Sequence, residues 1–256
     1  MIKKRIKKLR ELLKINNLDG YIVPKNDAYF GEFSMPDRLK SISNFSGSYG
    51  FALILKNKNY LFVDGRYTLQ AKIQSGGKFK IFTLPNQFPF HVFKRNKLKI
   101  GFDPKIHTRQ DLIRIFKKSY CKLIPTNQNL IDKIWVRKNN HVSKKFYTLP
   151  EHAVGQNYRH KINKIVETLK KLKVDYQFIS SGENVSWLLN IRGRDSEYAP
   201  VANAYLTLDI KKKVSLFCDL KKIDKNFKKK FKNIKFKNIE YLDQYLSEIR
   251  NKNILI

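Results

Sequence analysis

The sequence predicts an α/β protein built from two related domains, and three observations lead to this prediction. Segments with the apolar spacing of helices alternate with short apolar runs typical of strands. The order of these segments in the first half recurs in the second. Between residues 137 and 157 the periodicity is lost, in a run rich in Asn, Lys, Pro and Gly. We therefore expect one domain over residues 1–138 and a second over residues 139–256.

The first segment predicts an amphipathic surface helix followed by a short buried strand. The helix has apolar residues at 2, 6, 9, 12 and 13 and basic residues on its other face. Asn17, Asp19 and Gly20 end it, and residues 21–23 form an apolar run that Pro24 stops. Residues 25–40 are polar, and we expect a loop there.

The middle of the first half predicts a β-hairpin and then further helices and strands. The hairpin joins residues 51–55 to 60–63 through the turn-forming tetrad at 56–59. Thr108 and Asp111 have the spacing of a capping box and open a helix that runs through Lys118. The remaining expected elements are a helix at 67–74 and strands at 79–84, 98–102 and 122–124.

The second half repeats this order. A helix at 162–172 and a strand at 176–179 follow the boundary, as the first helix and strand follow the N-terminus. Asp19 aligns with Asp175, Asn44 with Asn190 and Asp64 with Asp219, at offsets of 156, 146 and 155 residues. We interpret this as a duplicated α/β domain, because a period this long excludes a solenoid.

Composition narrows the class of protein. Apolar residues make up 42% of the chain, which predicts a folded protein. The two cysteines, Cys121 and Cys218, belong to no CxxC motif, so we expect neither a disulfide framework nor a cysteine zinc site. No apolar run approaches the length of a membrane span, and the charged N-terminus lacks the apolar centre of a secretory signal. We expect a cytoplasmic protein that makes no membrane contact.

The formal net charge of +32 invites a nucleic-acid interpretation. Of the 53 basic residues, however, 41 are Lys and 12 are Arg, whereas phosphate and base recognition favours the Arg fork. Residues 211–237 contain 12 Lys, two acids and four interleaved Phe. A solvated, composition-driven face is the favoured reading of this segment, and a polyanion site is the alternative.

Motifs of common enzymes are missing. The five histidines form no HExxH, and the sequence contains no Walker A loop, no GxGxxG after a strand and no GxSxG elbow. The Ser46–Gly50 loop resembles such an elbow only superficially. It is interpreted mainly as a turn that leads into the hairpin, with ligand contact as the alternative.

The segment FVDGRYTLQ at 62–70 is more informative, because a buried strand turns there abruptly into a helix. Asp64 is placed to cap that helix, and the turn brings Arg66 to the strand end, where α/β sheets commonly face a ligand. From the residues alone, Arg66 has two roles open to it: a local pair with Asp64 or another acid, and recognition of an anion.

Four segments together resemble one known family, the Xaa-Pro aminopeptidases of the creatinase and prolidase superfamily. They are DGYIVPKNDAYFGEF, SNFSGSYGFALIL, LFVDGRYTLQA and NVSWLLNIRGRDSEYAPVANAYL. The resemblance spans essentially the whole chain and implies two creatinase N-terminal-like domains, each a mixed sheet flanked by helices. It further implies that Arg66 binds substrate, whereas Arg192 and Arg194 are assigned to domain contacts.

Family members hydrolyse the bond before proline in a third, catalytic domain that holds two divalent metals, usually manganese. This sequence contains none of the ligand carboxylates of that domain, so we expect no catalytic residue, no metal ligand and no activity in the chain alone. The resemblance implies a peptide with proline at its second position as substrate of the full-length enzyme, and assembly into a homo-oligomer. Two alternatives are a stand-alone binding module or pseudoenzyme, and a Lys-rich nucleic-acid-binding protein.

Overall fold

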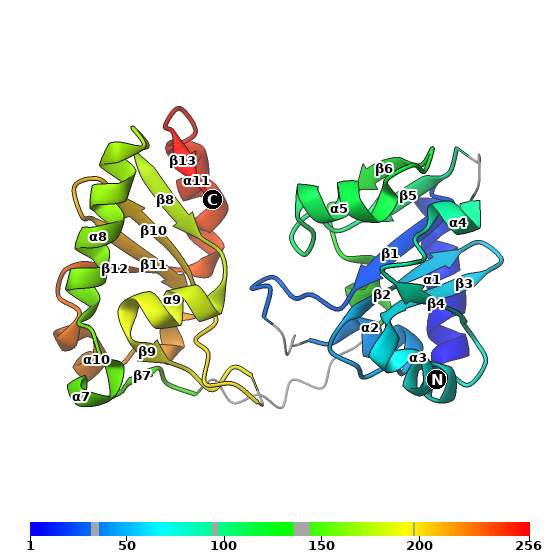
Figure 1. Cartoon of the computed structure of the whole chain (residues 1–256), viewed down its shortest axis with the longest axis horizontal. Coiled ribbons are helices and arrows are strands. Elements are labelled where there is room, and N and C mark those ends of the chain that lie inside the picture. Colours follow the sequence, from blue (N-terminus) through cyan, green and yellow to red (C-terminus); the bar gives the residue numbers. More distant parts are fainter. Residues whose placement is uncertain (32–35, 94–96, 136–143, 197) are drawn as a thin grey trace. The chain divides into compact units, whose positions relative to one another are not determined.

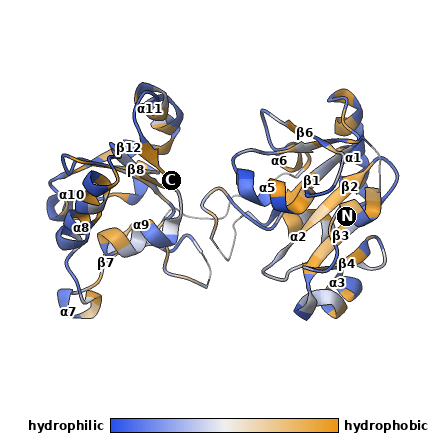
Figure 2. Ribbon diagram, turned by 45° about the horizontal axis from the view of Figure 1, so that its top comes forward, coloured by the Kyte–Doolittle hydropathy of each residue, from blue (hydrophilic) through white to orange (hydrophobic). Residues whose placement is uncertain are grey.

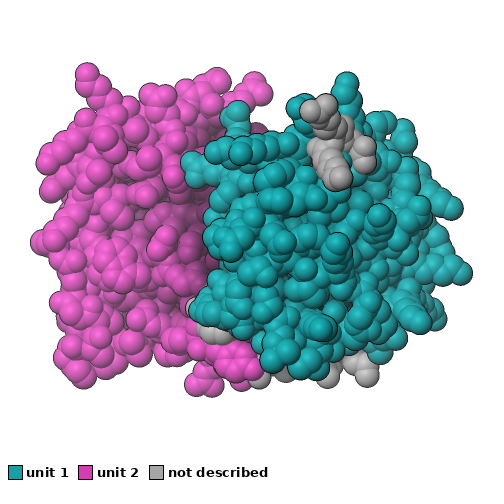
Figure 3. All heavy atoms as spheres, turned by 45° about the vertical axis from the view of Figure 1, so that its right-hand side comes forward, with its two compact units in different colours: residues 1–28, 34–139 teal, residues 29–33, 140–256 magenta. Residues whose placement is uncertain are grey.

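The computed structural model describes residues 1–31, 36–93, 97–135, 144–196 and 198–256 (Figure 1). The chain divides into two compact units, which Figure 3 colours separately. Unit 1 comprises Met1–Ala28 and Ser34–Asn139, and unit 2 comprises Tyr29–Phe33 and Asn140–Ile256. The boundary predicted between residues 138 and 139 lies outside the described residues.

Unit 1 contains a six-stranded mixed sheet in the order β4-β3-β2-β1-β5-β6. Strand β1 pairs antiparallel with β2 and parallel with β5. Strand β3 pairs antiparallel with β2 and parallel with β4, and β5 pairs parallel with β6. The strands are β1 (Gly20–Pro24), β2 (Gly50–Leu55), β3 (Asn59–Asp64), β4 (Lys80–Leu84), β5 (Lys99–Phe102) and β6 (Lys122–Pro125).

Helices cover both faces of this sheet because its strands are apolar on both faces (Figure 2). They are α1 (Ile2–Ile15), α2 (Arg38–Ser43), the 3₁₀ helix η1 (Gly65–Tyr67), α3 (Thr68–Ser75), α4 (Phe90–Phe93), α5 (Arg109–Phe116) and α6 (Leu130–Ile134). Helices α1, α2, α3 and α6 pack on the face that carries Val23 and Ala52. Helices α4 and α5 pack on the opposite face, which carries Ile22 and Leu53.

Helix α1 shows how the sequence pattern produces this packing. Ile2, Ile6, Leu9 and Leu13 recur at helical spacing and are all buried. The lysines between them remain exposed, so the helix lies on the sheet along one apolar stripe. The predicted amphipathic helix is confirmed.

Unit 2 contains a five-stranded sheet in the order β12-β11-β10-β8-β13 and a separate pair, β7 with β9. Its strands are β7 (Tyr147–Thr148), β8 (Tyr176–Ile179), β9 (Ile191–Arg192), β10 (Tyr205–Asp209), β11 (Val214–Cys218), β12 (Ile234–Asn238) and β13 (Ile254–Leu255). Its helices are α7 (Glu151–Val154), α8 (Tyr158–Lys171), α9 (Gly182–Leu189), η2 (Leu220–Lys222), α10 (Lys225–Lys230), η3 (Ile239–Tyr241) and α11 (Leu242–Glu248). Helices α8, α9 and α10 contribute to one apolar core with the sheet.

Five strands of the unit 1 sheet have the same order and directions as the five strands of the unit 2 sheet, and β6 is an additional edge strand of unit 1. Strand β8 pairs antiparallel with β10 and parallel with β13, as β1 does with β2 and β5. Strand β11 pairs antiparallel with β10 and parallel with β12, as β3 does with β2 and β4. The fold class predicted from the sequence, two related α/β domains with mixed sheets flanked by helices, is confirmed.

Residues aligned by the internal repeat also play the same structural part. Asn44 ends α2 and Asn190 ends α9, and both have left-handed backbone conformations, with φ of 64° and 56°. Asp64 and Asp219 each begin a 3₁₀ helix and accept a hydrogen bond from the backbone N–H two residues later. The duplication therefore extends to the caps of individual helices.

The prediction of a loop over residues 25–40 is wrong for its last three residues, because α2 begins at Arg38. Asp37 caps this short helix by accepting from the Lys40 N–H at 2.8 Å. The Arg38 guanidinium makes two hydrogen bonds to the Asp132 carboxylate, at 2.9 and 2.8 Å, which tie α2 to α6. A contact across 94 residues leaves no local pattern in the sequence.

The Lys-rich segment 211–237 forms β11, η2, α10 and β12. Three of its four phenylalanines, Phe217, Phe227 and Phe231, are buried, and Phe236 packs against the unit 2 core. Most of its lysines are exposed. The interleaved aromatic residues are therefore core side chains and not platforms for stacking nucleic-acid bases. None of the helices in the described ranges is both long and apolar enough to cross a membrane.

Candidate functional site

The candidate site lies where β3 ends and the chain turns into η1 and then α3. The Asp64 carboxylate accepts a hydrogen bond from the Arg66 backbone N–H at 3.0 Å. This bond satisfies a donor at the start of the 3₁₀ helix, which the sequence predicted as a capping role for Asp64. The turn is uncrowded at Gly65, since a Cβ built there would have Thr83 Cγ2 as its nearest neighbour, at 3.6 Å. The turn thus holds Arg66 at the end of the strand.

The Arg66 side chain is exposed and paired at the same time. Its Nε donates to Asp64 Oδ1 at 2.9 Å, yet 72% of the side chain remains accessible. Its guanidinium carbon lies 5.4 Å from the centre of the Tyr67 ring, within the range of a cation–π contact. The local pair with Asp64 weighed from the sequence is present, and it engages the inner nitrogen of the guanidinium.

Pairing with Arg66 changes the pKa of Asp64. The hydrogen bond from the Arg66 side chain, followed by that from its backbone N–H, lowers the pKa of Asp64 below its usual value. Asp64 is therefore ionised at neutral pH and fixes the guanidinium through a charge-assisted hydrogen bond. An arginine held in one orientation at an exposed strand end can bind a carboxylate or a carbonyl oxygen of a ligand.

The Ser46–Gly50 loop packs against the same turn. Ser48 Oγ lies 3.0 Å from Tyr67 Oη, so the two hydroxyls are hydrogen-bonded. The approach is close enough to require Gly47, because a Cβ there would lie 2.3 Å from the Phe45 ring and 3.0 Å from the Tyr67 ring. The ring edge of Tyr67 in turn packs on Phe45. The Tyr67 side chain is thereby fixed by the hydrogen bond of its hydroxyl with Ser48 and by the contact of its ring with Phe45.

Helix α3 adds two glutamines to this contact. Gln70 Nε2 and Gln74 Nε2 both donate to Ser46 Oγ, at 3.0 and 2.9 Å, and Gln74 Oε1 accepts from the Ser46 N–H at 2.9 Å. The loop and the DGRY turn are separate features in the sequence, and their contact was not predicted. The spacing of Gln70 and Gln74, one helical turn apart, was the signal that could have indicated a shared partner.

The two arginines of the second unit are placed differently. Arg192 Nη1 donates to the backbone carbonyls of Ser186 and Ile191, at 3.3 and 2.9 Å. The Arg194 guanidinium lies 5.9 Å from the centre of the Tyr147 ring. Both contacts lie inside unit 2, and the residues aligned with the DGR turn there are Asp219, Leu220 and Lys221.

The described part of the chain contains no group of three or more His, Cys, Asp or Glu side chains that converge as a metal site would require. Cys218 is buried, and burial raises its pKa to about 12, so it remains a neutral thiol. His107 is also buried, which lowers its pKa, and its Nδ1 lies 2.9 Å from the Asp103 carbonyl oxygen.

Comparison with known families identifies both halves of the chain. Residues 5–134 match a creatinase/prolidase N-terminal domain model, and residues 137–256 match a second model with the same description. The chain belongs to the creatinase/prolidase N-terminal domain family. Two consecutive creatinase N-terminal domains account for the repeated topology of the two sheets.

Relatives of these creatinase N-terminal domains are aminopeptidases. A probable Xaa-Pro aminopeptidase P of Coprinopsis cinerea is 33% identical over 263 residues, covering 96% of this chain and 42% of the relative. Xaa-Pro aminopeptidase 1 of Dictyostelium discoideum is 30% identical over 246 residues, covering 87% of this chain and 38% of the relative. The chain thus spans about two fifths of the length of the curated relatives that it matches.

A solved structure shows the same organisation. The X-prolyl aminopeptidase from Caenorhabditis elegans, described as a cytosolic enzyme with a di-nuclear active site, matches with a TM-score of 0.88 and 25% sequence identity. The match covers 98% of this chain and 44% of that structure. The chain corresponds to the N-terminal, non-catalytic region of Xaa-Pro aminopeptidases, as the resemblance implied.

Proposed function

We propose that this chain is the substrate-recognition region of an Xaa-Pro aminopeptidase, a metallopeptidase that releases the N-terminal residue before proline. The observation that carries the proposal is the match of both creatinase N-terminal domains, over 98% of the chain, to an X-prolyl aminopeptidase. The complete enzyme would hold two divalent metals, manganese by family resemblance, in a further domain. A di-nuclear active site in the Caenorhabditis elegans enzyme supports this part of the proposal.

Within this function, Arg66 is the residue proposed to bind the peptide. Its support is geometric: the side chain is 72% exposed, and Asp64 and Tyr67 fix its orientation. A guanidinium so placed donates charge-assisted hydrogen bonds to an oxygen of the peptide. Ser48 contacts Tyr67 directly, and Ser46, Gln70 and Gln74 tie the loop that carries Ser48 to α3, so these four are assigned as positioning residues.

The same proposal extends to assembly, location and domain boundary. A homo-oligomer of the complete enzyme and a cytoplasmic location follow from the family resemblance, and the description of the Caenorhabditis elegans relative as cytosolic supports the location. The boundary between the two domains is proposed to lie between residues 138 and 139, just inside the second family-model match, which begins at residue 137, whereas the first ends at residue 134.

The experiment compares the chain alone with a chimera in which the remainder of the Coprinopsis cinerea relative is joined after residue 256. Both are supplied with manganese and a peptide that has proline at its second position. The chimera is expected to release the first residue and to lose activity with a chelator, whereas the chain alone is expected to release none. Chelator-sensitive turnover that co-purifies with the chain alone would refute the assignment as a non-catalytic region.

A further inference from the structure

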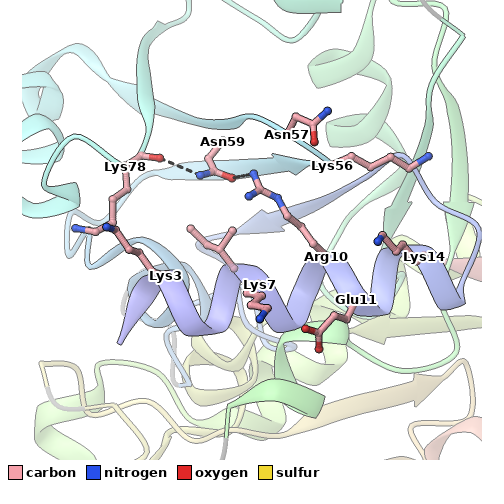
Figure 4. A pocket seen from close by; sticks show the side chains of 10 residues that line it. Lys3, Lys7, Arg10, Glu11, Lys14, Lys56, Asn57, Asn59 and Lys78 are labelled. Carbon is pink, nitrogen blue, oxygen red and sulfur yellow. Dashed lines mark hydrogen bonds between the residues drawn. The ribbon is translucent and has the colours of Figure 1, made fainter.

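A basic groove in unit 1, with a volume of about 670 Å³, runs beside α1 and is separate from the DGRY turn. One wall is the exposed face of α1, and the other is the turn between β2 and β3 together with Lys78, which follows α3 (Figure 4). The cations that line it are Lys3, Lys7, Arg10, Lys14, Lys56 and Lys78. Glu11 is the single acid among the described residues that line it.

The cations of α1 lie on one helical face. Positions 3, 7, 10 and 14 follow the spacing i, i+4, i+7 and i+11, which places them one above the other along the groove. Like charges at these spacings repel and weaken a helix. An anion bound along the stripe would remove that repulsion, so the helix and the ligand would stabilise each other.

Arg10 is the best-defined cation of the groove. It reaches across from α1 and donates from Nε to the Leu55 carbonyl oxygen at 3.0 Å and from Nη2 to Asn59 Oδ1 at 2.9 Å (Figure 4). Asn59 is itself fixed, because its Nδ2 donates to the Lys78 carbonyl oxygen at 3.0 Å. Both acceptors of Arg10 are neutral, and partial burial lowers its pKa. The groove therefore contains an oriented guanidinium whose charge no carboxylate balances within the described residues.

Lysines at both ends of the groove extend this charge. Lys3 and Lys78 lie toward one end and Lys14 and Lys56 toward the other (Figure 4). Lys56 is partly neutralised, since its Nζ lies 2.5 Å from Asp19 Oδ1. Over the described ranges, Lys3, Lys7, Lys14 and Lys78 form no ion pair with an acid. Their charges are available to a ligand.

We propose that this groove binds an acidic peptide segment in an extended conformation. From Lys3 to Lys14, α1 rises about 16 Å, which corresponds to about five residues of extended chain. Lysine ammonium groups meet carboxylates as mobile point charges, and the amide of Asn57 suits a peptide backbone. None of the described residues that line the groove is aromatic and able to stack a nucleic-acid base, which favours a peptide over a single-stranded nucleic acid.

The test measures fluorescence anisotropy of a labelled pentaglutamate peptide at low ionic strength, where exposed charges are least screened. The groove variant is Lys7→Glu with Lys14→Glu. The matched control is Lys225→Glu with Lys229→Glu, which makes the same change in net charge at exposed positions of α10. Because two attractive contacts become repulsive, the groove variant should bind about tenfold more weakly, and the control should stay within about twofold of the parent chain.

Thermal melting of both variants checks that each remains folded. Equal weakening in the two variants would show that binding follows net charge alone, and it would overturn the proposal. Absence of binding by the parent chain would overturn it as well. So would tighter binding of a thymidine oligonucleotide of equal charge that displaces the peptide. None of these outcomes depends on Arg66 or on peptidase activity, so the test is independent of the proposed function.

Discussion

Asp19 and Asp175 make the same long-range hydrogen bond in the two halves of the chain. The Asp19 carboxylate accepts from the Lys99 backbone N–H at 2.9 Å, and that of Asp175 accepts from the Asn253 N–H at 3.0 Å. In return, the N–H of each aspartate donates to the carbonyl oxygen of the same partner, at 2.8 and 2.9 Å. Each aspartate therefore ties the start of β1 or β8 to the start of the parallel strand beside it.

Replacing either aspartate by Ala should lower the free energy of unfolding by about 1 kcal/mol, because the hydrogen bond from the backbone N–H of the neighbouring strand is lost. Asp19→Ala also removes the hydrogen bond from the exposed Lys56 side chain, which adds little to this value. Urea unfolding of Asp19→Ala and Asp175→Ala measures this, with Glu167→Ala at an exposed position of α8 as the control. The Lys56 hydrogen bond, and then the Lys99 N–H, lower the pKa of Asp19. The contribution of Asp19 is thus complete above its unfolded pKa of about 3.9 and is lost as the pH falls through its lower folded value. An effect of Asp19→Ala that is as large in acid as at neutral pH would contradict this account.

Arg66→Ala in the active chimera should reduce kcat/KM about 10- to 150-fold, corresponding to about 1.5 to 3 kcal/mol of charge-assisted hydrogen bonding. Arg66→Lys should recover little of this, since an ammonium cannot reproduce the planar fork. Steady-state kinetics and melting temperature are measured on the same variants. A lowered melting temperature with an unchanged kcat/KM would assign Arg66 to its pair with Asp64 alone.

The imidazole of His107 should make stability pH-dependent near neutrality. Burial lowers its pKa below the ordinary value, although the Asp103 carbonyl, Asp103 and Asp111 oppose this shift. The unfolded chain then binds more protons than the folded chain, so the free energy of unfolding falls as the pH drops below about 6.5. Urea unfolding at several pH values should show this decline in the parent chain. It should be reduced in His107→Asn and retained in His152→Asn, whose histidine is exposed; identical pH profiles of all three proteins would refute it.

Fragments 1–138 and 139–256 should each unfold cooperatively when expressed alone. Each contains its own sheet and its own apolar core, two clusters in the first and one in the second. The second fragment lacks Tyr29, whose ring stacks on Tyr205 at 4.9 Å within unit 2, and should therefore be less stable than the same region in the whole chain. Denaturant unfolding monitored by circular dichroism tests both statements. A non-cooperative transition in either fragment would argue against the proposed division.

Local patterns predicted most of the helices and strands of unit 1, and α8 and β8 of unit 2, because these elements are determined locally. The apolar spacing of α1, the hairpin of β2 and β3, and the Thr108 cap of α5 all depend on residues within one turn or strand of each other. Helix α2 was missed because it is short and its stability depends on Arg38 pairing with Asp132. Helix α9 was missed for a related reason. Its buried Ser186 Oγ accepts a hydrogen bond from the Ala202 N–H at 2.9 Å, and a partner 16 residues away leaves no local pattern in the sequence.

The candidate site was predicted only in part. The DGRY turn places Asp64 and Arg66 two residues apart, so their pairing was foreseeable. The contacts of Ser46 with Gln70 and Gln74 span 24 and 28 residues and depend on how α3 packs beside the loop. The spacing of Gln70 and Gln74 places both on one face of α3, but it cannot identify Ser46 as their partner, because that contact is created by the packing of the sheet and helix.

The same turn follows β3 in the first domain and β11 in the second, so the two copies of the turn can be compared directly. Asp64 and Asp219 close the two turns with the same backbone hydrogen bond, at 3.0 Å in each. Both copies therefore have the hydrogen bond that closes this turn. The side chain two positions later is a guanidinium in the first copy and an ammonium, Lys221, in the second. Arginine at that position is thus dispensable for making the turn, and the guanidinium of Arg66 is a feature of the first copy that the turn itself does not require.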